Sequence, residues 1–168
     1  MVIITIKAKP LTVEGFAPYG KAILIPDDNN PERPTDRFNF WPKLSLLKCD
    51  SGVFQVGVST FFKRPFRTMN VEKHYKTEEF MSPLVGSFVL LFAKTKDGRP
   101  GSEPDFESAE AFVIHPNQCV VVDREVWHWS PMPFKDNSTM LCIFAEDTHK
   151  GDLEIQPLPN GQIIEVQV

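Results

Sequence analysis

Apolar residues are arranged along this chain in short runs that are rich in Val, Ile, Phe and Thr. The 15 prolines are spread between and around these runs. Because proline lacks a backbone N–H and fixes its own φ angle, they leave little room for long helices. We interpret eight of the runs as β-strands, at residues 3–6, 22–25, 53–62, 88–93, 111–114, 119–122, 140–144 and 163–166. This many short strands with little helix predicts an all-β sandwich or barrel.

One short helix is expected near the start of the chain. Thr12 can cap its N-terminus, the turn would run through Phe16, and Pro18 would end it. Two polar stretches rich in proline, glycine and charge, at residues 27–37 and 94–108, are expected to be long surface loops. Neither resembles a linker and the sequence contains no internal repeat, so we expect a single domain over residues 1–168.

Composition and net charge indicate which kinds of partner this protein can bind. A chain of 168 residues, 42% hydrophobic and 24% charged, has the balance of an ordinary globular domain. It can bury roughly two-thirds of the surface of its unfolded chain, so a bound metal would serve function rather than folding. The formal net charge of -4 argues against a protein that holds nucleic acid through phosphate contacts. A small molecule is the expected partner.

The number and spacing of the cysteines and the lengths of the apolar runs predict the cellular compartment. The three cysteines, at positions 49, 119 and 142, are odd in number and widely separated, so they form neither a disulfide framework nor a Cys-x-x-Cys motif. The apolar run at 1–7 is too short for a signal-peptide core, and the run at 88–93 is far shorter than the roughly 20 residues of a membrane-spanning helix. We therefore expect a cytoplasmic protein that does not contact a membrane.

The first concentration of ionisable groups lies between residues 69 and 86. Residues two apart in a strand share a face, so Glu72 and His74 would point the same way, and Glu79 could return beside them after a short turn. Imidazole and carboxylate groups would then converge. The alternative is a solvated charged face, formed with Lys73 and its neighbours, in which His74 has no special role.

The second concentration surrounds His128, which is flanked by Trp127 and Trp129. Two indoles would form a concave apolar wall around one ionisable group, as in a ligand pocket. The alternative is that both indoles fill the core on one face of the strand while His128 lies on the other.

The spacing of these groups resembles the two-motif pattern of the cupin superfamily: His74, four residues, Glu79, six residues and Gly86, followed later by a turn and His128. The resemblance implies an all-β double-stranded β-helix, a jelly-roll-like barrel with one or two short helices. It also implies a divalent metal bound by Glu72, His74, Glu79 and His128, with Glu72 in the place of the first histidine. Nitrogen and oxygen ligands suit Ni, Mn, Fe or Zn without choosing among them.

A closer resemblance, over most of the chain, is to the ureidoglycolate lyase family, formerly called ureidoglycolate hydrolase. The similar stretches are IKAKPLT (6–12), FAPYG (16–20), EKH (72–74), EF (79–80), AFV (111–113) and VWH (126–128). Membership would imply cleavage of ureidoglycolate to glyoxylate and urea, in allantoin and purine breakdown, by a cytoplasmic homodimer that is a carbon–nitrogen lyase of the amidine-lyase type. The chain departs from the family where Trp129 and Ser130 follow His128, and where Glu79 replaces a Gln and makes the first motif more similar to metal-binding cupins.

The residues can be assigned roles in that reaction. Release of urea from a hemiaminal carbon needs a base for the hydroxyl proton and an acid for the departing nitrogen, and His74 and His128 are the catalytic candidates. A carboxylate substrate also needs a cation in the pocket. The candidates for substrate binding are the apolar Trp127 and the basic Lys73, Arg64, Arg67 and Arg124. His115 and His149 do not join the spacing and are expected at the surface.

Two other functions stay open at this point. One is a metal-binding cupin enzyme that acts on a different small acid, and the other is a non-catalytic cupin that binds a small molecule. A homodimer is expected in each case, because the apolar run at 3–6 would leave an unprotected strand edge that can pair with a second chain.

Overall fold

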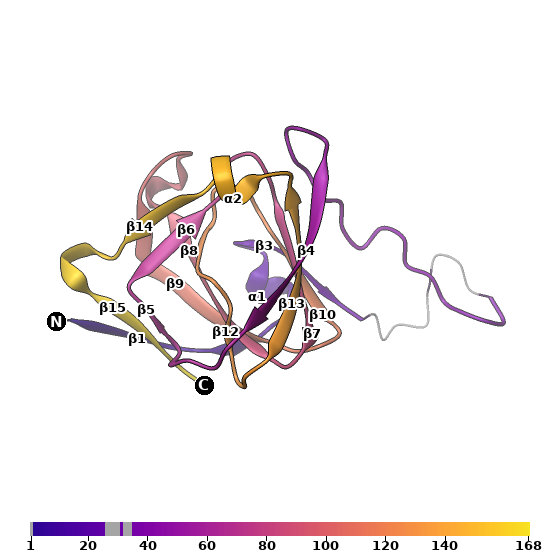
Figure 1. Ribbon diagram of the computed structural model, residues 1–168, viewed down its shortest axis with the longest axis horizontal. Coiled ribbons are helices and arrows are strands. Elements are labelled where there is room, and N and C mark those ends of the chain that lie inside the picture. The colour runs from indigo at the N-terminus through magenta and orange to yellow at the C-terminus, as the bar shows by residue number, and fades with distance from the viewer. Residues whose placement is uncertain (1, 26–30, 32–34) are drawn as a thin grey trace.

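β-Strands are the main regular secondary structure of the computed structural model, which describes residues 2–25, 31 and 35–168 (Figure 1). The described residues form strands, two one-turn α-helices and two 3-10 turns, in the order β1 (Ile3–Lys7), β2 (Lys9–Pro10), α1 (Val13–Phe16), β3 (Gly20–Leu24), β4 (Phe54–Phe61), β5 (Arg67–Thr68), β6 (Asn70–Lys73), β7 (Glu79–Val85), β8 (Phe88–Thr95), η1 (Lys96–Gly98), β9 (Pro104–Ile114), β10 (Gln118–Val122), β11 (Trp127–His128), β12 (Met132–Pro133), β13 (Ser138–Ala145), α2 (Thr148–Gly151), β14 (Glu154–Pro157), η2 (Pro159–Gly161) and β15 (Ile163–Gln167).

All eight predicted strands are present, as β1, β3, β4, β8, β9, β10, β13 and β15. The predicted helix is also confirmed: α1 follows Thr12, whose hydroxyl oxygen accepts the N–H of Gly15 at 3.0 Å. The loop expected at 94–108 is wrong in extent, because β8 and β9 stay paired through Thr95 and Pro104 and leave only a short connection. The loop expected at 27–37 falls mostly on residues outside those that the structure describes.

One sheet has five strands in the order β3-β10-β7-β13-β4, and all of its neighbours are antiparallel. Alternation along β13 directs Met140 and Cys142 into the core and leaves the residues between them on the outer face. The turn from β7 to β8 contains Gly86 at φ +80°, where an added Cβ would lie 2.3 Å from the hydroxyl oxygen of Ser138. The glycine of the first motif is therefore required by the backbone.

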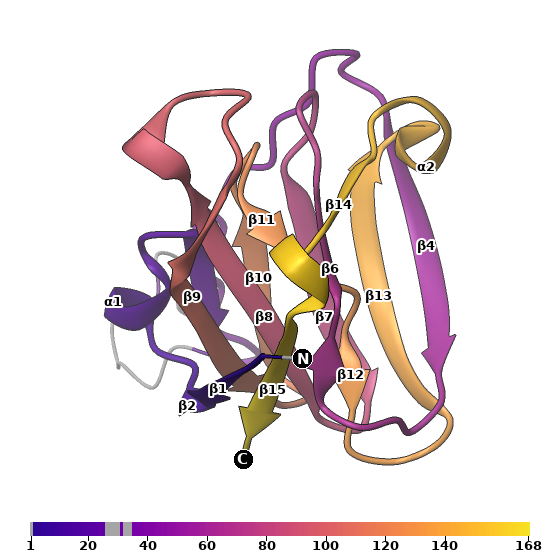
Figure 2. The same ribbon diagram turned by 90° about the vertical axis from the view of Figure 1, so that its left-hand side faces the viewer.

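The second large sheet has the order β14-β6-β11-β8-β9-β2, with β12 also paired to β8. Its inner face packs against the five-stranded sheet, and its outer face is covered by β1 and β15, which bring Ile164 and Val166 against Val89 and Leu91 (Figure 2). The two ends of the chain thus supply a third layer over this sheet. Among the described residues, hydrogen bonding does not close the two large sheets into one continuous barrel. The architecture is that of an all-β jelly roll.

The core between the two large sheets is rich in aromatic rings. Phe16 of α1 is fully buried and meets Phe92 and Phe112 edge to face, with ring centroids 4.9 and 5.6 Å apart. This packing closes one side of the core and leaves the ends of β6, β7 and β11 to carry ionisable groups. None of the helices in the described parts of the chain has the length and apolar character needed to span a bilayer.

Candidate active site

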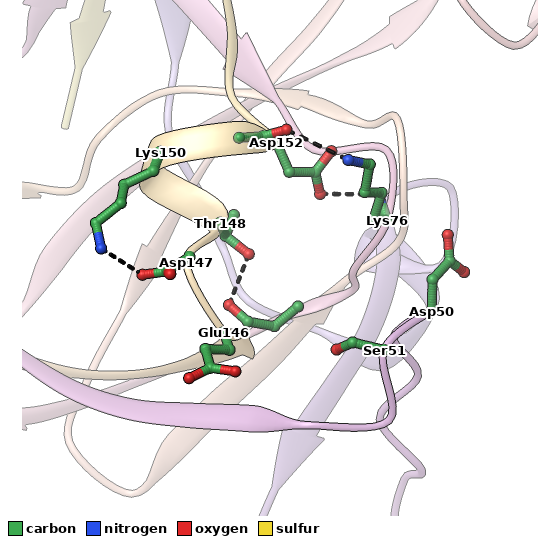
Figure 3. Close-up of a pocket in the computed structure, with 10 residues that line it drawn as sticks. Asp50, Ser51, Lys76, Glu146, Asp147, Thr148, Lys150 and Asp152 are labelled. Carbon is green, nitrogen blue, oxygen red and sulfur yellow. Dashed lines mark hydrogen bonds and ion pairs between the residues drawn. The ribbon is translucent and has the colours of Figure 1, made fainter.

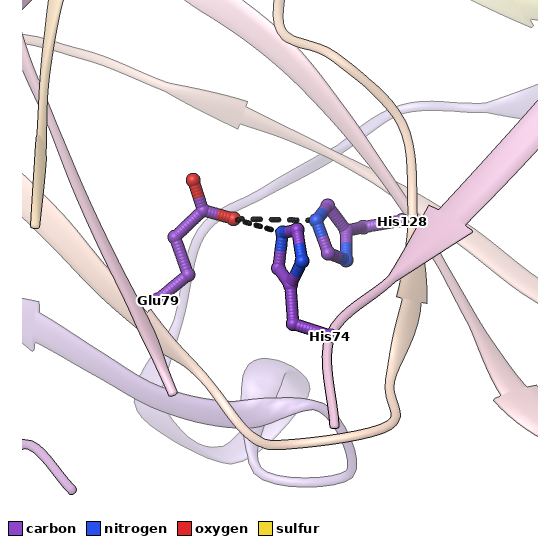
Figure 4. Close-up of side chains that lie close together, drawn as sticks. All are labelled: His74, Glu79 and His128. Atoms are coloured by element: carbon purple, nitrogen blue, oxygen red, sulfur yellow. Dashed lines mark ion pairs between the residues drawn. The ribbon is translucent and has the colours of Figure 1, made fainter. Parts of the chain in front are cut away.

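Three ionisable side chains, two from strands and one from a turn, converge at one site (Figure 4). His74 directly follows β6, Glu79 begins β7, and His128 ends β11. β6 and β11 are paired antiparallel, with Glu72 opposite His128, while the turn after His74 carries the chain across to the five-stranded sheet. The site therefore bridges the two sheets.

The three side chains lie within reach of one small ligand. Glu79 Oε2 is 3.6 Å from Nε2 of His74 and 3.2 Å from Nε2 of His128. The two imidazole centroids are 5.2 Å apart. One ligand atom from each residue can be chosen so that all three lie within 4.8 Å of one another. The structure thus brings together three of the four residues that the cupin spacing selects.

Backbone carbonyls orient both imidazole rings. His74 Nδ1 lies 2.7 Å from the carbonyl oxygen of Asp152, and His128 Nδ1 lies 2.9 Å from that of Val126. A carbonyl oxygen can only accept a hydrogen bond, so we assign the proton of each ring to Nδ1. Each ring then presents Nε2 to Glu79, which is the arrangement found when a second partner fixes a metal-binding histidine.

Burial and mutual charge determine the ionisation of the cluster. Burial opposes ionisation of Glu79, but its interactions with His128 and His74 outweigh burial and lower its pKa to about 2. Burial likewise opposes protonation of His128, and the carboxylates of Glu79 and Glu72 more than offset it, so the pKa of His128 is raised. An anionic carboxylate therefore faces imidazole nitrogens in a site shielded from water.

A divalent metal fits this donor set. Within the described residues, His128 Nε2 is a buried polar atom without a hydrogen-bond partner, although Glu79 Oε2 is close by. A neutral ring with its proton on Nδ1 would direct the Nε2 lone pair at a carboxylate oxygen, which is repulsive unless a proton or a cation lies between them. Two imidazole nitrogens and one carboxylate oxygen are ligands that Ni, Mn, Fe and Zn accept.

Glu72, the fourth predicted ligand, is outside this group of ligand atoms. It is half-buried, and its pKa is raised by burial and by Glu79, while His128 and His74 act in the opposite direction. Glu72 therefore interacts electrostatically with the cluster, although its carboxylate is not among the converging ligand atoms. Its backbone pairs with that of His128 across the β6–β11 ladder, so Glu72 lies on the same face of the sheet as that imidazole.

Lys73 and Trp127 require a correction, because they lie on the face of β6 and β11 opposite Glu72 and His128. Lys73 is fully buried, with its ammonium 4.3 Å from the centre of the Trp127 ring and 3.2 Å from the carbonyl oxygen of Ser102. Trp127 packs with Val71 and Ala93. The indole is a core residue, as in the second interpretation of this segment, and the structure does not bring either side chain to the imidazoles.

Two of the three predicted arginines have other partners, and the third is exposed. Arg64 donates to the carbonyl oxygens of Ser130 and Pro131 at 3.0 and 2.8 Å. Arg124 forms a 2.6 Å ion pair with Asp50, and Arg67 is exposed on β5. The structure does not gather these cations around the imidazoles, so their assignment to the substrate carboxylate has no geometric support. His115 and His149 are exposed, as expected.

A cavity of about 500 Å³ lies between α2 and the turn after β6 (Figure 3), and none of the three cluster residues lines it. It is lined by Asp50, Ser51, Lys76, Ala145, Glu146, Asp147, Thr148, Lys150, Gly151 and Asp152. Asp152 also accepts the Nδ1 proton of His74 through its carbonyl oxygen. Sequence reasoning missed Asp152, because a backbone carbonyl carries no signature of residue type and the contact spans 78 positions.

Comparison with known proteins gives consistent matches. A family model described as ureidoglycolate lyase matches residues 3–165. The ureidoglycolate lyase of Chelativorans sp. strain BNC1 is 27% identical over 141 residues, covering 81% of this chain and 82% of that protein. The ureidoglycolate lyase of Brucella anthropi is 26% identical over 149 residues, covering 83% and 82%. Among solved structures, a dTDP sugar isomerase from Desulfovibrio desulfuricans G20 aligns over 84% of this chain and 83% of its own, with 14% identity and a TM-score of 0.47.

Proposed function

Because the chain belongs to the ureidoglycolate lyase family, we propose that it cleaves ureidoglycolate to glyoxylate and urea at the cluster of His74, Glu79 and His128. The observation that carries the proposal is the convergence of two imidazole Nε2 atoms on one carboxylate oxygen in a buried site. Breaking the carbon–nitrogen bond to urea makes the reaction that of an amidine lyase.

In the first version of the mechanism, His74, Glu79 and His128 hold a divalent metal. When bound there, the metal supplies a Lewis acid for the hydroxyl or carboxylate oxygens of the substrate. The protein fixes the Nε2 atom of each imidazole by holding its Nδ1 proton on a carbonyl oxygen. Phe92, whose ring centroid is 6.4 Å from that of His128, helps to exclude bulk water.

In the second version, the histidines themselves move the protons. Nδ1 of each ring is engaged by a carbonyl, so Nε2 is the atom that would take the proton of the substrate hydroxyl or give one to the departing nitrogen. Glu79 would hold the resulting imidazolium. A given histidine cannot act as a metal ligand and as an acid or base through the same Nε2 atom, so the two versions are distinguishable.

The proposed reaction also suggests a metabolic pathway and a cellular compartment for the enzyme. Glyoxylate and urea are products of allantoin breakdown, so the enzyme would act in purine degradation. The three cysteines are free, which supports a reducing compartment such as the cytoplasm.

The test is metal analysis of the purified protein together with an assay for glyoxylate released from ureidoglycolate. We expect turnover by the wild type and a loss of about 10²-fold or more in His128→Ala, with His149→Ala as the control because His149 is an exposed imidazole. Full activity in His128→Ala would refute the assignment. Activity that disappears with a chelator and returns with one of the four metals supports the first version, and activity in metal-free protein supports the second.

A homodimer belongs to the same proposal, and the outer face of the five-stranded sheet is its best-supported interface. Val56 and Val58 of β4 are 69% and 59% exposed. They lie opposite Ile143 and Leu141 of β13 in the ladder, so the outer surface of these strands is apolar. Chain ends cover the outer face of the other large sheet. An uncovered apolar face of this kind is typical of a protein interface.

The occupant that we propose is a second copy of the chain. The strands of this sheet are five to eight residues long, so at about 3.3 Å per residue and about 4.8 Å between strands the five together offer on the order of 500 Å². A standard interface buries about 800 Å² per partner. The segment around residues 38–46, which carries exposed Phe38, Phe40, Leu44 and Leu46 and runs away from the sheets in Figure 1, can supply the difference.

Light scattering measures this directly. We expect a species of twice 19.1 kDa for the wild type and a folded monomer for the double variant Val56→Lys/Val58→Lys. The matched control is Val13→Lys/Ile155→Lys, which changes two valine or isoleucine side chains of 51% and 52% exposure elsewhere and should remain dimeric. A monomeric wild type would overturn the homodimer. Dissociation by Ile3→Lys instead would move the interface to the edge of β1.

A further inference from the structure

Asp152 connects two segments that lie far apart in the sequence. It follows α2, is 7% exposed, and accepts the backbone N–H of Tyr75 at 3.0 Å and that of Lys76 at 2.8 Å with its two carboxylate oxygens. Figure 3 shows its contact with Lys76. Its own carbonyl oxygen lies 2.7 Å from Nδ1 of His74. One residue thus holds three consecutive positions of the turn after β6.

We propose that Asp152 is the positioning residue for His74: by tying the turn to the end of α2, its carboxylate keeps its carbonyl oxygen on Nδ1 and thereby presents Nε2 to Glu79. A catalytic effect of Asp152 rests on the proposed function. The orientation of the His74 ring by Asp152 does not depend on that function. The carboxylate acts through His74 and is not itself directed at the converging atoms.

The local geometry explains why the side chain of Asp152 controls the contact of its carbonyl. His74 lies just beyond the last residue of β6, so its ring is not held by strand alternation. Its own carbonyl oxygen is fixed by the N–H of Glu125 at 2.7 Å. The opposite side of the turn is attached to α2 mainly through the carboxylate, whose bonds to backbone N–H groups are charge-assisted and therefore stronger than neutral ones.

His128 provides an internal comparison. Its Nδ1 bonds to the carbonyl of Val126, only two residues earlier in the chain. That contact is set by the local backbone and does not pass through α2. Loss of the Asp152 carboxylate should therefore change the environment of the His74 ring and leave that of His128 unchanged, which a general loss of stability would not do.

The variants to compare are Asp152→Ala, which removes both acceptors, and Asp152→Asn, which keeps one. The matched control is Asp136→Ala, because Asp136 also accepts a long-range backbone N–H, from Lys63 at 2.7 Å, at an exposed position. Imidazole ¹⁵N spectra of the metal-free protein report the tautomer of each ring, and the chain has 4 histidines to assign. A titration with Zn²⁺ reports how well the cluster is arranged.

In Asp152→Ala we expect the ring signals of His74 to move from the Nδ1–H tautomer to a mixture of tautomers, with those of His128 in place. Zn²⁺ affinity should fall about 10- to 100-fold, as for other groups that orient metal ligands. Asp152→Asn should lie between Asp152→Ala and the wild type, and Asp136→Ala should match the wild type in both readouts. Unchanged His74 signals in Asp152→Ala, or equal effects in Asp136→Ala, would overturn the proposal. Absence of ureidoglycolate turnover in the wild type would refute the proposed function and leave this result intact.

Discussion

Lys73 offers a direct test between a substrate-binding role and a structural one. Its ammonium is enclosed by the rings of Trp127 and Tyr75, at 4.3 and 4.8 Å from their centroids, and by the carbonyl oxygen of Ser102. Glu154 is 3.8 Å away. The perturbation is a pair of variants: Lys73→Ala removes the stem and the charge, whereas Lys73→Met removes the charge and keeps most of the volume.

The magnitude follows from these contacts. Truncation to Ala deletes three buried methylene groups, about 2.4 kcal/mol at about 0.8 kcal/mol each. The hydrogen bond and the two cation–π contacts are favourable by about 0.5 to 3 kcal/mol each, and the several kcal/mol of desolvation of a buried charge largely offset them. We expect Lys73→Ala to lose about 2 to 4 kcal/mol, a fall in Tm of roughly 5 to 15 °C for a chain of this size. Lys73→Met should recover most of the loss, because its sulfur also packs well on aromatic rings.

Thermal unfolding and steady-state kinetics on ureidoglycolate are the assays, with Lys7→Met as the control on an exposed strand position. KM should stay within about twofold of wild type in Lys73→Met, since no uniform binding contact is lost. A charged contact to the substrate carboxylate is worth about 1.5 to 3 kcal/mol, or at least about tenfold in KM. Lys73→Met with native stability and a tenfold higher KM would therefore refute the structural interpretation.

Three further predictions test the centre and the fold. Glu79→Gln keeps the size of the side chain but removes its charge from between the imidazoles. Calorimetry should therefore find that Zn²⁺ binds more than about 100-fold more weakly, a larger loss than for residues that only orient metal ligands. Equal Zn²⁺ affinity in the variant and the wild type would contradict the ligand assignment. Phe16→Ala removes a ring that touches Phe92 and Phe112 and should cost about 3 to 5 kcal/mol in urea unfolding; a loss below about 1 kcal/mol would mean that α1 does not close the core. Gly20→Ala should not yield folded protein, because Gly20 has φ +144° and an added Cβ would lie 2.0 Å from the carbonyl oxygen of Val121, whereas Gly57→Ala, with nothing within 4 Å, should fold normally.

The strands that the sequence identifies are those whose β-branched and aromatic residues form continuous runs, such as β8 and β13. β7 escaped detection because its sequence, EFMSPLV, contains a proline and polar residues. Pro83 is tolerated there because the ladder with β13 is irregular between Thr139 and Met140, next to the position that faces Pro83, and a bulge removes the need for one N–H donor. Such an irregularity depends on the partner strand and is not visible in the local sequence.

At the site, residue spacing was a better guide than residue adjacency. The intervals between His74, Glu79 and His128 reflect the turns that join the two sheets, so they predicted which side chains meet. Adjacency suggested that Trp127 and Lys73 also face the ligand, yet neighbouring residues in a strand point to opposite faces. Alternation places Glu72 on the face of His128, directly opposite it in the β6–β11 ladder, but it does not bring the Glu72 carboxylate into the group of converging ligand atoms.

The directions in which these side chains point also determine how strongly the cluster attracts an anionic substrate. Of the four cations predicted for the substrate carboxylate, three are engaged elsewhere: Lys73 beneath Trp127, Arg124 with Asp50, and Arg64 with backbone carbonyls. The fourth, Arg67, is exposed on β5. The groups at the centre are instead an ionised Glu79, the nearby carboxyl of Glu72 and two imidazoles. With both carboxyls ionised, this set is at most neutral even when both rings are protonated, so it gives an anionic substrate little electrostatic attraction. A divalent cation on the two Nε2 atoms and Glu79 would require both rings to be neutral, so with both carboxyls ionised the set would again have a net charge of zero. Net charge therefore does not distinguish the two versions of the mechanism, and removal of metal by a chelator followed by its restoration is the measurement that separates them.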